Sequence, residues 1–182
     1  MVTGASSDLA GALRARLANV TDPEIPVLTI EDLGILRDVK VHAGGRVEVI
    51  ITPTYSGCPA LHQLEQDIVA EMAAAGYADV TVTTALSPAW TTDWMTGEGR
   101  RKLQGYGIAP PVGSGPAGPV SLSLSSRPPV NVRCPRCGEA ARETSRFGST
   151  ACKAAYVCTS CQEPFDYSKA ICSTINRRNE AR

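Results

Sequence analysis

A stretch rich in proline and glycine, residues 109–129, most constrains how this chain of 182 residues can fold. Nine of its twenty-one residues are proline or glycine. Proline has no backbone N–H and a fixed φ, so helix interiors and central strands exclude it. We therefore expect two small domains, residues 1–108 and 130–182, joined by a linker at 109–129 in which Val120–Leu124 could still form an edge strand.

Composition and charge narrow the class of protein. An apolar content of 43% is sufficient for a packed core. Residues 1–127 carry nine basic and thirteen acidic side chains, and residues 128–182 carry nine and five. The positive balance of the tail is small and aromatic residues there are few, so nucleic-acid binding is not favoured. Met1–Ala5 does not resemble a signal peptide and no apolar run could span a membrane, so we expect a cytoplasmic protein with no membrane partner.

Hydrophobic periodicity in residues 1–108 predicts the order α-β-β-α-β-α, a small two-layer α/β sandwich with helices on one sheet face. With a β-rich zinc ribbon in the tail, the predicted fold class is α+β. The predicted elements are a helix capped by Ser6–Asp8, strands near 35–41 and 46–52 joined at Gly44–Gly45, a helix from Pro59 to Gly76, a strand over 79–86, and a helix capped within Trp90–Trp94.

Cys58 stands between an apolar run, residues 47–51, and a segment with helical spacing. Pro59 suits the first helical position, which places Cys58 at or beside the N-cap. The positive end of the helix dipole lowers a thiol pKa and favours the thiolate, which binds metal or attacks electrophiles. The alternative is that Cys58 is a small buried packing residue.

Two Cys-x-x-Cys pairs lie in the tail, separated by twenty residues: Cys134, Cys137, Cys158 and Cys161. Two such turns supply four thiolates in a tetrahedron, and zinc is the ion that favours this set. A segment of this size builds little core, so the metal would supply much of its folding free energy. A single iron ion is the main rival, because the same spacing holds iron in electron carriers.

The other candidate residues carry weaker signals. Cys152 lies beside a lysine that could favour its thiolate. It is expected to pack under the ribbon, with a second site as the alternative, whereas Cys172, near the chain end, carries almost no information. His42 is expected to point outward from a strand. His62, one turn from Cys58, is expected to be solvated, although it could also tune that cysteine.

Three segments resemble the small domain of iron–sulfur assembly factors of the SufT type: Asp22–Pro26, Asp32–Gly34 and Thr52–Pro59. The resemblance covers about residues 7–105. It implies that Cys58 is a reactive or metal-handling cysteine and that Asp22 and Glu24 belong to an acidic loop with the same role. Domains of this type often form homodimers, which would bring two copies of Cys58 into play.

Over its whole length the chain resembles the PaaD family, whose members are components of phenylacetyl-CoA epoxidase systems. The further segments that carry this resemblance are Trp90–Trp94, Gly105–Pro111, Ser145–Thr150, Cys152–Ala154 and Glu163–Tyr167. The resemblance implies four ribbon ligands around structural zinc and an accessory role in aerobic phenylacetate degradation. The implied partners are the oxygenase and reductase subunits.

The leading hypothesis is therefore a maturation factor, not itself an epoxidase, that transiently holds iron or an iron–sulfur cluster. In this hypothesis Cys58 exchanges metal while the ribbon holds its ion permanently. The alternative is an electron carrier with iron in the four-cysteine tail. A free-standing cysteine enzyme is not favoured, because no Cys/His/Asn constellation and no cofactor-binding glycine motif is present.

Overall fold

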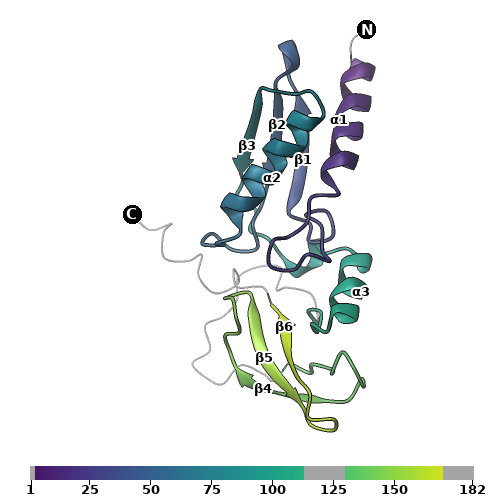
Figure 1. Ribbon diagram of the computed structural model, residues 1–182, viewed down its shortest axis with the longest axis vertical. Coiled ribbons are helices and arrows are strands. Elements are labelled where there is room, and N and C mark those ends of the chain that lie inside the picture. Colours follow the sequence, from purple (N-terminus) through teal and green to yellow (C-terminus); the bar gives the residue numbers. More distant parts are fainter. Residues whose placement is uncertain (1–2, 113–129, 170–182) are drawn as a thin grey trace. The chain divides into compact units, whose positions relative to one another are not determined.

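A computed structural model describes residues 3–112 and 130–169 of the chain (Figure 1). The contacts between residues divide the chain into two compact units. The first comprises residues 1–90 and 94–99, and the second comprises residues 91–93 and 100–182. The predicted edge strand Val120–Leu124 lies outside the described residues. The domain limits at 108 and 129 stay predictions.

The element order α-β-β-α-β-α and the α+β class are confirmed by the structure. The elements before the linker are α1 (Thr3–Leu17), β1 (Leu36–Val41), β2 (Val47–Ile51), α2 (Leu61–Ala74), β3 (Val80–Thr84) and α3 (Gly97–Tyr106). Within the described residues, every helix is too short or too polar to span a lipid bilayer.

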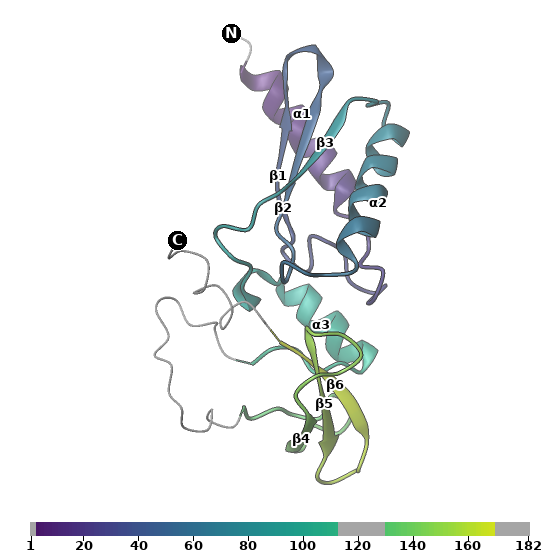
Figure 2. The same ribbon diagram turned by 90° about the vertical axis from the view of Figure 1, so that its left-hand side faces the viewer.

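The first sheet has the strand order β1-β2-β3. Strands β1 and β2 form the predicted antiparallel hairpin (Figure 2). Gly44 and Gly45 turn it with φ of 84° and 85°, a region that glycine enters without steric cost. Strand β3 pairs parallel to β2, so α2 serves as the crossover between them. The sequence did not predict this parallel pairing.

The core of this unit lies between the sheet and two helices, with α1 packed along β1 and α2 along β3 (Figure 1). Alternate residues of β2 are fully buried, which identifies the face that the helices cover. From α2, the predicted stripe supplies Leu64, Ile68 and Met72, each at most 2% exposed, whereas Leu61 is half-buried. The predicted helical face is therefore largely confirmed.

Three predicted helix starts were wrong by a few residues. Helix α1 already includes Thr3, so the predicted capping residues Ser6–Asp8 lie inside it. Helix α2 begins at Leu61 because the Cys58 carbonyl accepts the Leu61 N–H in a preceding tight turn, which leaves Pro59 outside the helix. Helix α3 is capped by Thr96, whose Oγ1 accepts the Gly99 N–H at 2.9 Å.

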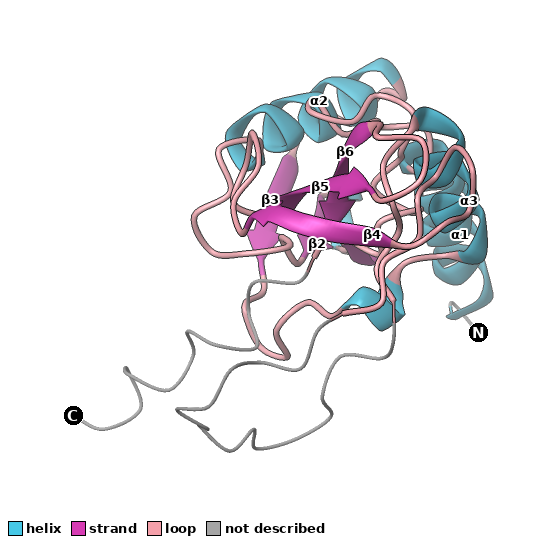
Figure 3. Ribbon diagram, turned by 90° about the horizontal axis from the view of Figure 1, so that it is seen from below, coloured by secondary structure: helices cyan, strands magenta, loops and turns pink. Residues whose placement is uncertain are grey.

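The ribbon is a separate three-stranded antiparallel sheet with the order β4-β5-β6. Its strands are β4 (Ala141–Ser145), β5 (Lys153–Cys158) and β6 (Pro164–Ser168), and Figure 3 shows β5 between its two neighbours. Tyr156 packs against Phe165 and Tyr167 in a small core of buried residues. Ala109 joins this unit through a parallel bridge to Tyr167.

Candidate metal centre and the Cys58 turn

The ribbon brings together the four cysteines of the two Cys-x-x-Cys pairs. Their sulfur atoms all lie within 4.8 Å of one another, and Cys137 Sγ is 3.4 Å from Cys158 Sγ and 3.6 Å from Cys161 Sγ. Cys134 and Cys158 are buried, whereas Cys137 and Cys161 are exposed. Among the described residues, this is the only group of three or more possible ligands close enough to hold one ion.

The chain forms this cluster because each pair lies in a tight turn. In the first turn the Gly138 N–H donates to the Cys134 carbonyl at 2.9 Å, with Gly138 at φ of 76°. In the second turn, the N–H groups of Ser160 and Cys161 point at Cys158 Sγ, each 3.4 Å away. These N–H donors stabilise negative charge on sulfur, which is the form that binds metal.

The electrostatics of the four sulfurs fit a cation. Burial raises the pKa of Cys158, but the N–H groups of Cys161 and Ser160 and the neighbouring thiols more than offset it and lower the pKa to about 6. At Cys161 the Glu163 N–H favours the thiolate, yet the adjacent Cys158 sulfur raises the pKa to about 12. The Cys158 thiolate therefore forms easily, whereas its proximity raises the pKa of Cys137 and of Cys161. A divalent ion removes the repulsion between thiolates, so the donor set suits zinc or iron.

Cys58 lies in a surface turn between β2 and α2. Its N–H donates to the Tyr55 carbonyl at 3.2 Å, and its own carbonyl accepts the Leu61 N–H at 3.2 Å. The cysteine is half-buried, and its neighbours Gly57 and Pro59 are exposed. The N-cap of α2 is Ala60, which has no side-chain cap, so Cys58 lies two residues before the cap position.

The acidic loop has a clear internal structure. Asp22 is 9% exposed, and its Oδ1 accepts the N–H groups of Glu24 and Ile25, both at 2.8 Å. Asp22 therefore holds the loop in shape, while Glu24 is half-buried. The structure does not bring Asp22, Glu24 and Cys58 together as ligands of one ion. The part of each in metal handling stays a prediction.

Comparisons with known proteins agree with this two-part organisation. Residues 11–84 match a family described as iron–sulfur cluster assembly protein, and residues 119–169 match the PaaD zinc beta ribbon domain. The chain is 50% identical over 158 residues to an Escherichia coli K12 protein named as a component of 1,2-phenylacetyl-CoA epoxidase. That match covers 86% of this chain and 90% of the relative. The chain belongs to the PaaD family.

Other similarities of this PaaD-family chain concern its first domain. The chain is 35% identical over 88 residues to a Porphyromonas gingivalis protein named Fe-S protein maturation auxiliary factor. This match covers 48% of this chain and 83% of that protein. A solved domain of unknown function from Bacillus anthracis superposes with a TM-score of 0.51 at 24% identity. This superposition covers 54% of this chain and 94% of the Bacillus anthracis chain, and it shows the fold alone.

None of the remaining described candidates in this PaaD-family chain belongs to the four-cysteine group. Cys152 is half-buried with its sulfur 3.0 Å from Thr150 Oγ1. His62 is exposed, and its Nε2 lies 3.1 Å from the amide nitrogen of Gln66. His42 Nε2 lies 3.1 Å from a Glu48 carboxylate oxygen. Cys172 lies outside the described residues.

Sequence reasoning missed one residue that shapes the first domain. Asp32 is only 6% exposed, and its carboxylate accepts hydrogen bonds from the Thr29 N–H at 3.1 Å and the Thr96 hydroxyl at 3.3 Å. It thereby joins the loop before β1 to the start of α3. The sequence signals were its place in the Asp32–Gly34 segment that carries the family resemblance and its position, with Glu31, between the apolar residues Ile30 and Leu33.

Proposed function

We propose that this PaaD-family chain is an accessory maturation factor of a phenylacetyl-CoA epoxidase system in aerobic phenylacetate degradation. It assists the delivery of iron or an iron–sulfur cluster to the oxygenase or reductase subunits, and the iron is cargo, not a resident cofactor. The observation that carries the proposal is the half-buried Cys58 in a surface turn, inside the residues that match the iron–sulfur assembly family. The name of the Porphyromonas gingivalis relative supports the same role.

A single cysteine suits transfer better than storage. One protein thiolate leaves the other positions on iron to an outside thiol, a second copy of the chain or the acceptor. Transfer is then ligand exchange without oxidation or reduction: a thiolate of the acceptor bonds to iron and the Cys58–iron bond breaks. We propose that Glu24 offers a further oxygen ligand during this exchange, and that Asp22 positions Glu24 through its two backbone hydrogen bonds.

The ribbon has the complementary role in this proposal. Cys134, Cys137, Cys158 and Cys161 form a closed set of four sulfur ligands around zinc, which then has no open position for exchange. The ion stabilises the fold of residues 130–169, and the ribbon offers a surface for the epoxidase subunits. We further propose that the chain works as a homodimer in the cytoplasm, where reducing conditions keep these thiols free.

Replacement of Cys58 by serine tests the role of the turn. In cells that express the epoxidase system, C58S should leave the oxygenase and reductase subunits short of iron and lower epoxidase activity at least tenfold. The variant should fold normally, because serine is nearly isosteric and the side chain is only half-buried. The matched control is C152S, which changes another half-buried cysteine and should keep full activity. Full iron content and activity with C58S would refute the proposal.

A second candidate function is electron transfer to the same oxygenase. The observation in its favour is the tetrathiolate itself, because four clustered sulfurs can also hold a single redox-active iron. Ferric iron in this site absorbs visible light and is red, whereas zinc is colourless. Metal analysis and a visible spectrum of protein purified without added metal separate the two. One zinc per chain and no visible band would eliminate the electron carrier.

A further inference from the structure

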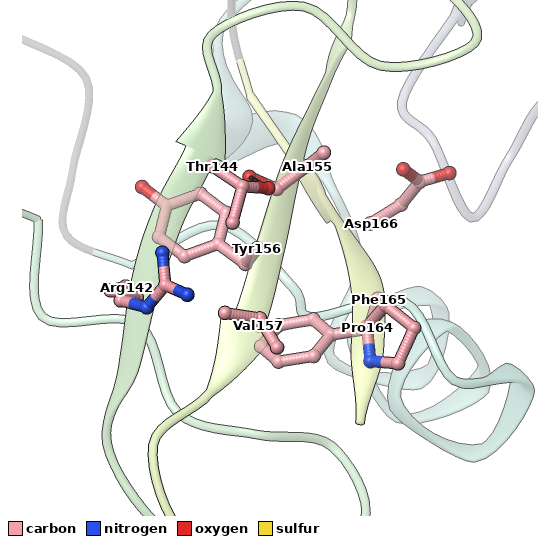
Figure 4. Close-up of a pocket in the computed structure, with 8 residues that line it drawn as sticks. All are labelled: Arg142, Thr144, Ala155, Tyr156, Val157, Pro164, Phe165 and Asp166. Carbon is pink, nitrogen blue, oxygen red and sulfur yellow. Dashed lines mark hydrogen bonds between the residues drawn. The ribbon is translucent and has the colours of Figure 1, made fainter. Parts of the chain in front are cut away.

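The outer face of the ribbon sheet carries a short apolar strip, the residues Ala155 and Val157 on its central strand, next to Lys153, which is 7% exposed. On β5, Tyr156 points into the ribbon core and is 4% exposed, so Ala155 and Val157 lie on the opposite face by strand alternation. The register pairs Val157 with Pro164 on β6, which extends the strip sideways. Residues of this face, together with Tyr156 and Phe165, line an open hollow of about 540 Å³ (Figure 4).

Two opposite charges flank this apolar strip on the two edge strands. Arg142 on β4 is in register with Val157, and Asp166 on β6 is in register with Ala155. Both side chains line the hollow in Figure 4. Within residues 3–112 and 130–169, neither side chain makes an ion pair or a side-chain hydrogen bond. Arg142 is exposed and Asp166 is half-buried, so both charges are available to a partner.

We propose that two copies of the chain associate through this face, with Arg142 of each copy paired to Asp166 of the other. A twofold axis parallel to β5 places β4 of one sheet over β6 of the other. Arg142 and Asp166 differ by two residues along the strand direction, about 7 Å, which a long arginine side chain spans. The apolar strips then meet at the centre, with an ion pair on each side.

Charge complementarity favours a second copy over other occupants. After a half-turn Arg142 of each copy lies over the strand that carries Asp166 of the other, so these two charges meet opposite charges. The face is also small: three strands of about five residues span roughly 10 by 17 Å. A face of this size is well below the standard interface of about 800 Å² per partner, so association is expected to be weak and to show only at high protein concentration.

This surface lies in the ribbon, whereas the resemblance that implies a homodimer concerns the first domain and its Cys58. The inference rests on the proposed homodimer and not on iron delivery. An active maturation factor that uses another interface would therefore overturn this inference and leave the proposed function intact.

Sedimentation equilibrium of the full-length zinc-loaded chain over a wide concentration range tests the proposal. The wild type should dimerise, and R142E and D166R should each weaken the dimer at least tenfold because like charges then face each other. An equimolar mixture of R142E and D166R should restore association. In the mixed dimer the two substituted side chains form one ion pair with reversed polarity, and the native Arg142 and Asp166 form the other. The matched control is R146E, the same charge change at an exposed ribbon residue outside the hollow.

Each result has a definite reading. A monomeric wild type at several hundred micromolar would overturn both the surface and the homodimer. A dimer unaffected by R142E would overturn this surface alone. Loss of dimerisation in R146E to the same extent would show a general charge effect and would also overturn it. R142E changes an exposed side chain and should fold, which a zinc content equal to wild type verifies, so the proposal stays testable even if D166R misfolds.

Discussion

Removal of the ribbon metal should unfold residues 130–169 and leave the first domain folded. A segment of 40 residues has a net stability of about 2–6 kcal/mol at the usual 0.05–0.15 kcal/mol per residue. Binding of zinc to four cysteines contributes about 10–16 kcal/mol at neutral pH. The zinc-binding free energy exceeds the whole stability expected for such a segment. Two of the eight buried core residues, Cys134 and Cys158, also belong to the four-cysteine group.

Two probes report the two units separately. Both tryptophans of the chain, Trp90 and Trp94, belong to the first unit, and Trp90 is buried with its indole N–H bonded to the Leu33 carbonyl at 2.8 Å. Tryptophan emission should therefore survive chelation. Hydrogen exchange followed by mass spectrometry should show loss of amide protection in β4, β5 and β6 but not in β1 and β2.

Re-addition of zinc should restore amide protection in the ribbon strands, with one equivalent bound per chain. A C134S variant should behave like the chelated protein, because the remaining three sulfurs leave the set incomplete. Persistent protection of the ribbon after complete metal removal would refute the reasoning, since the small core would then be sufficient by itself.

Two further predictions concern the first domain. Alanine at Gly34, where φ is 67° and an added Cβ would lie 2.3 Å from the Trp94 carbonyl oxygen, should lower the free energy of unfolding by about 3 kcal/mol in urea titrations. Alanine at Gly57, where the nearest atom is 3.8 Å away, should change it little. The hydrogen bond with His42 lowers the pKa of Glu48 in the folded protein. This contact therefore stabilises the fold at pH values above the pKa of Glu48 in the unfolded chain, and the stabilisation is lost as pH falls through the pKa of Glu48 in the folded protein. NMR titration should show a higher Glu48 pKa in H42A, and an unchanged value would contradict the assignment.

The order of elements and the four-cysteine group could be predicted from sequence because both depend on local spacing. The stripe of Leu64, Ile68 and Met72 repeats with the period of a helix, and each Cys-x-x-Cys pair closes its own turn. Helix starts were predicted less well. The turn at Cys58 and the cap at Thr96 depend on which carbonyl or hydroxyl reaches a given N–H, and several neighbouring residues offered suitable groups.

The sequence by itself determined the α+β class, the order of the elements and which four cysteines come together. Only the tertiary structure decided that β3 runs parallel to β2, that the buried Asp22 carboxylate bonds to the loop backbone, and that Arg142 and Asp166 share one face. The physical reason is the separation in sequence between the residues that interact. Periodicity and turn chemistry act over a few residues, whereas strand register and burial depend on segments that meet only when the chain has folded.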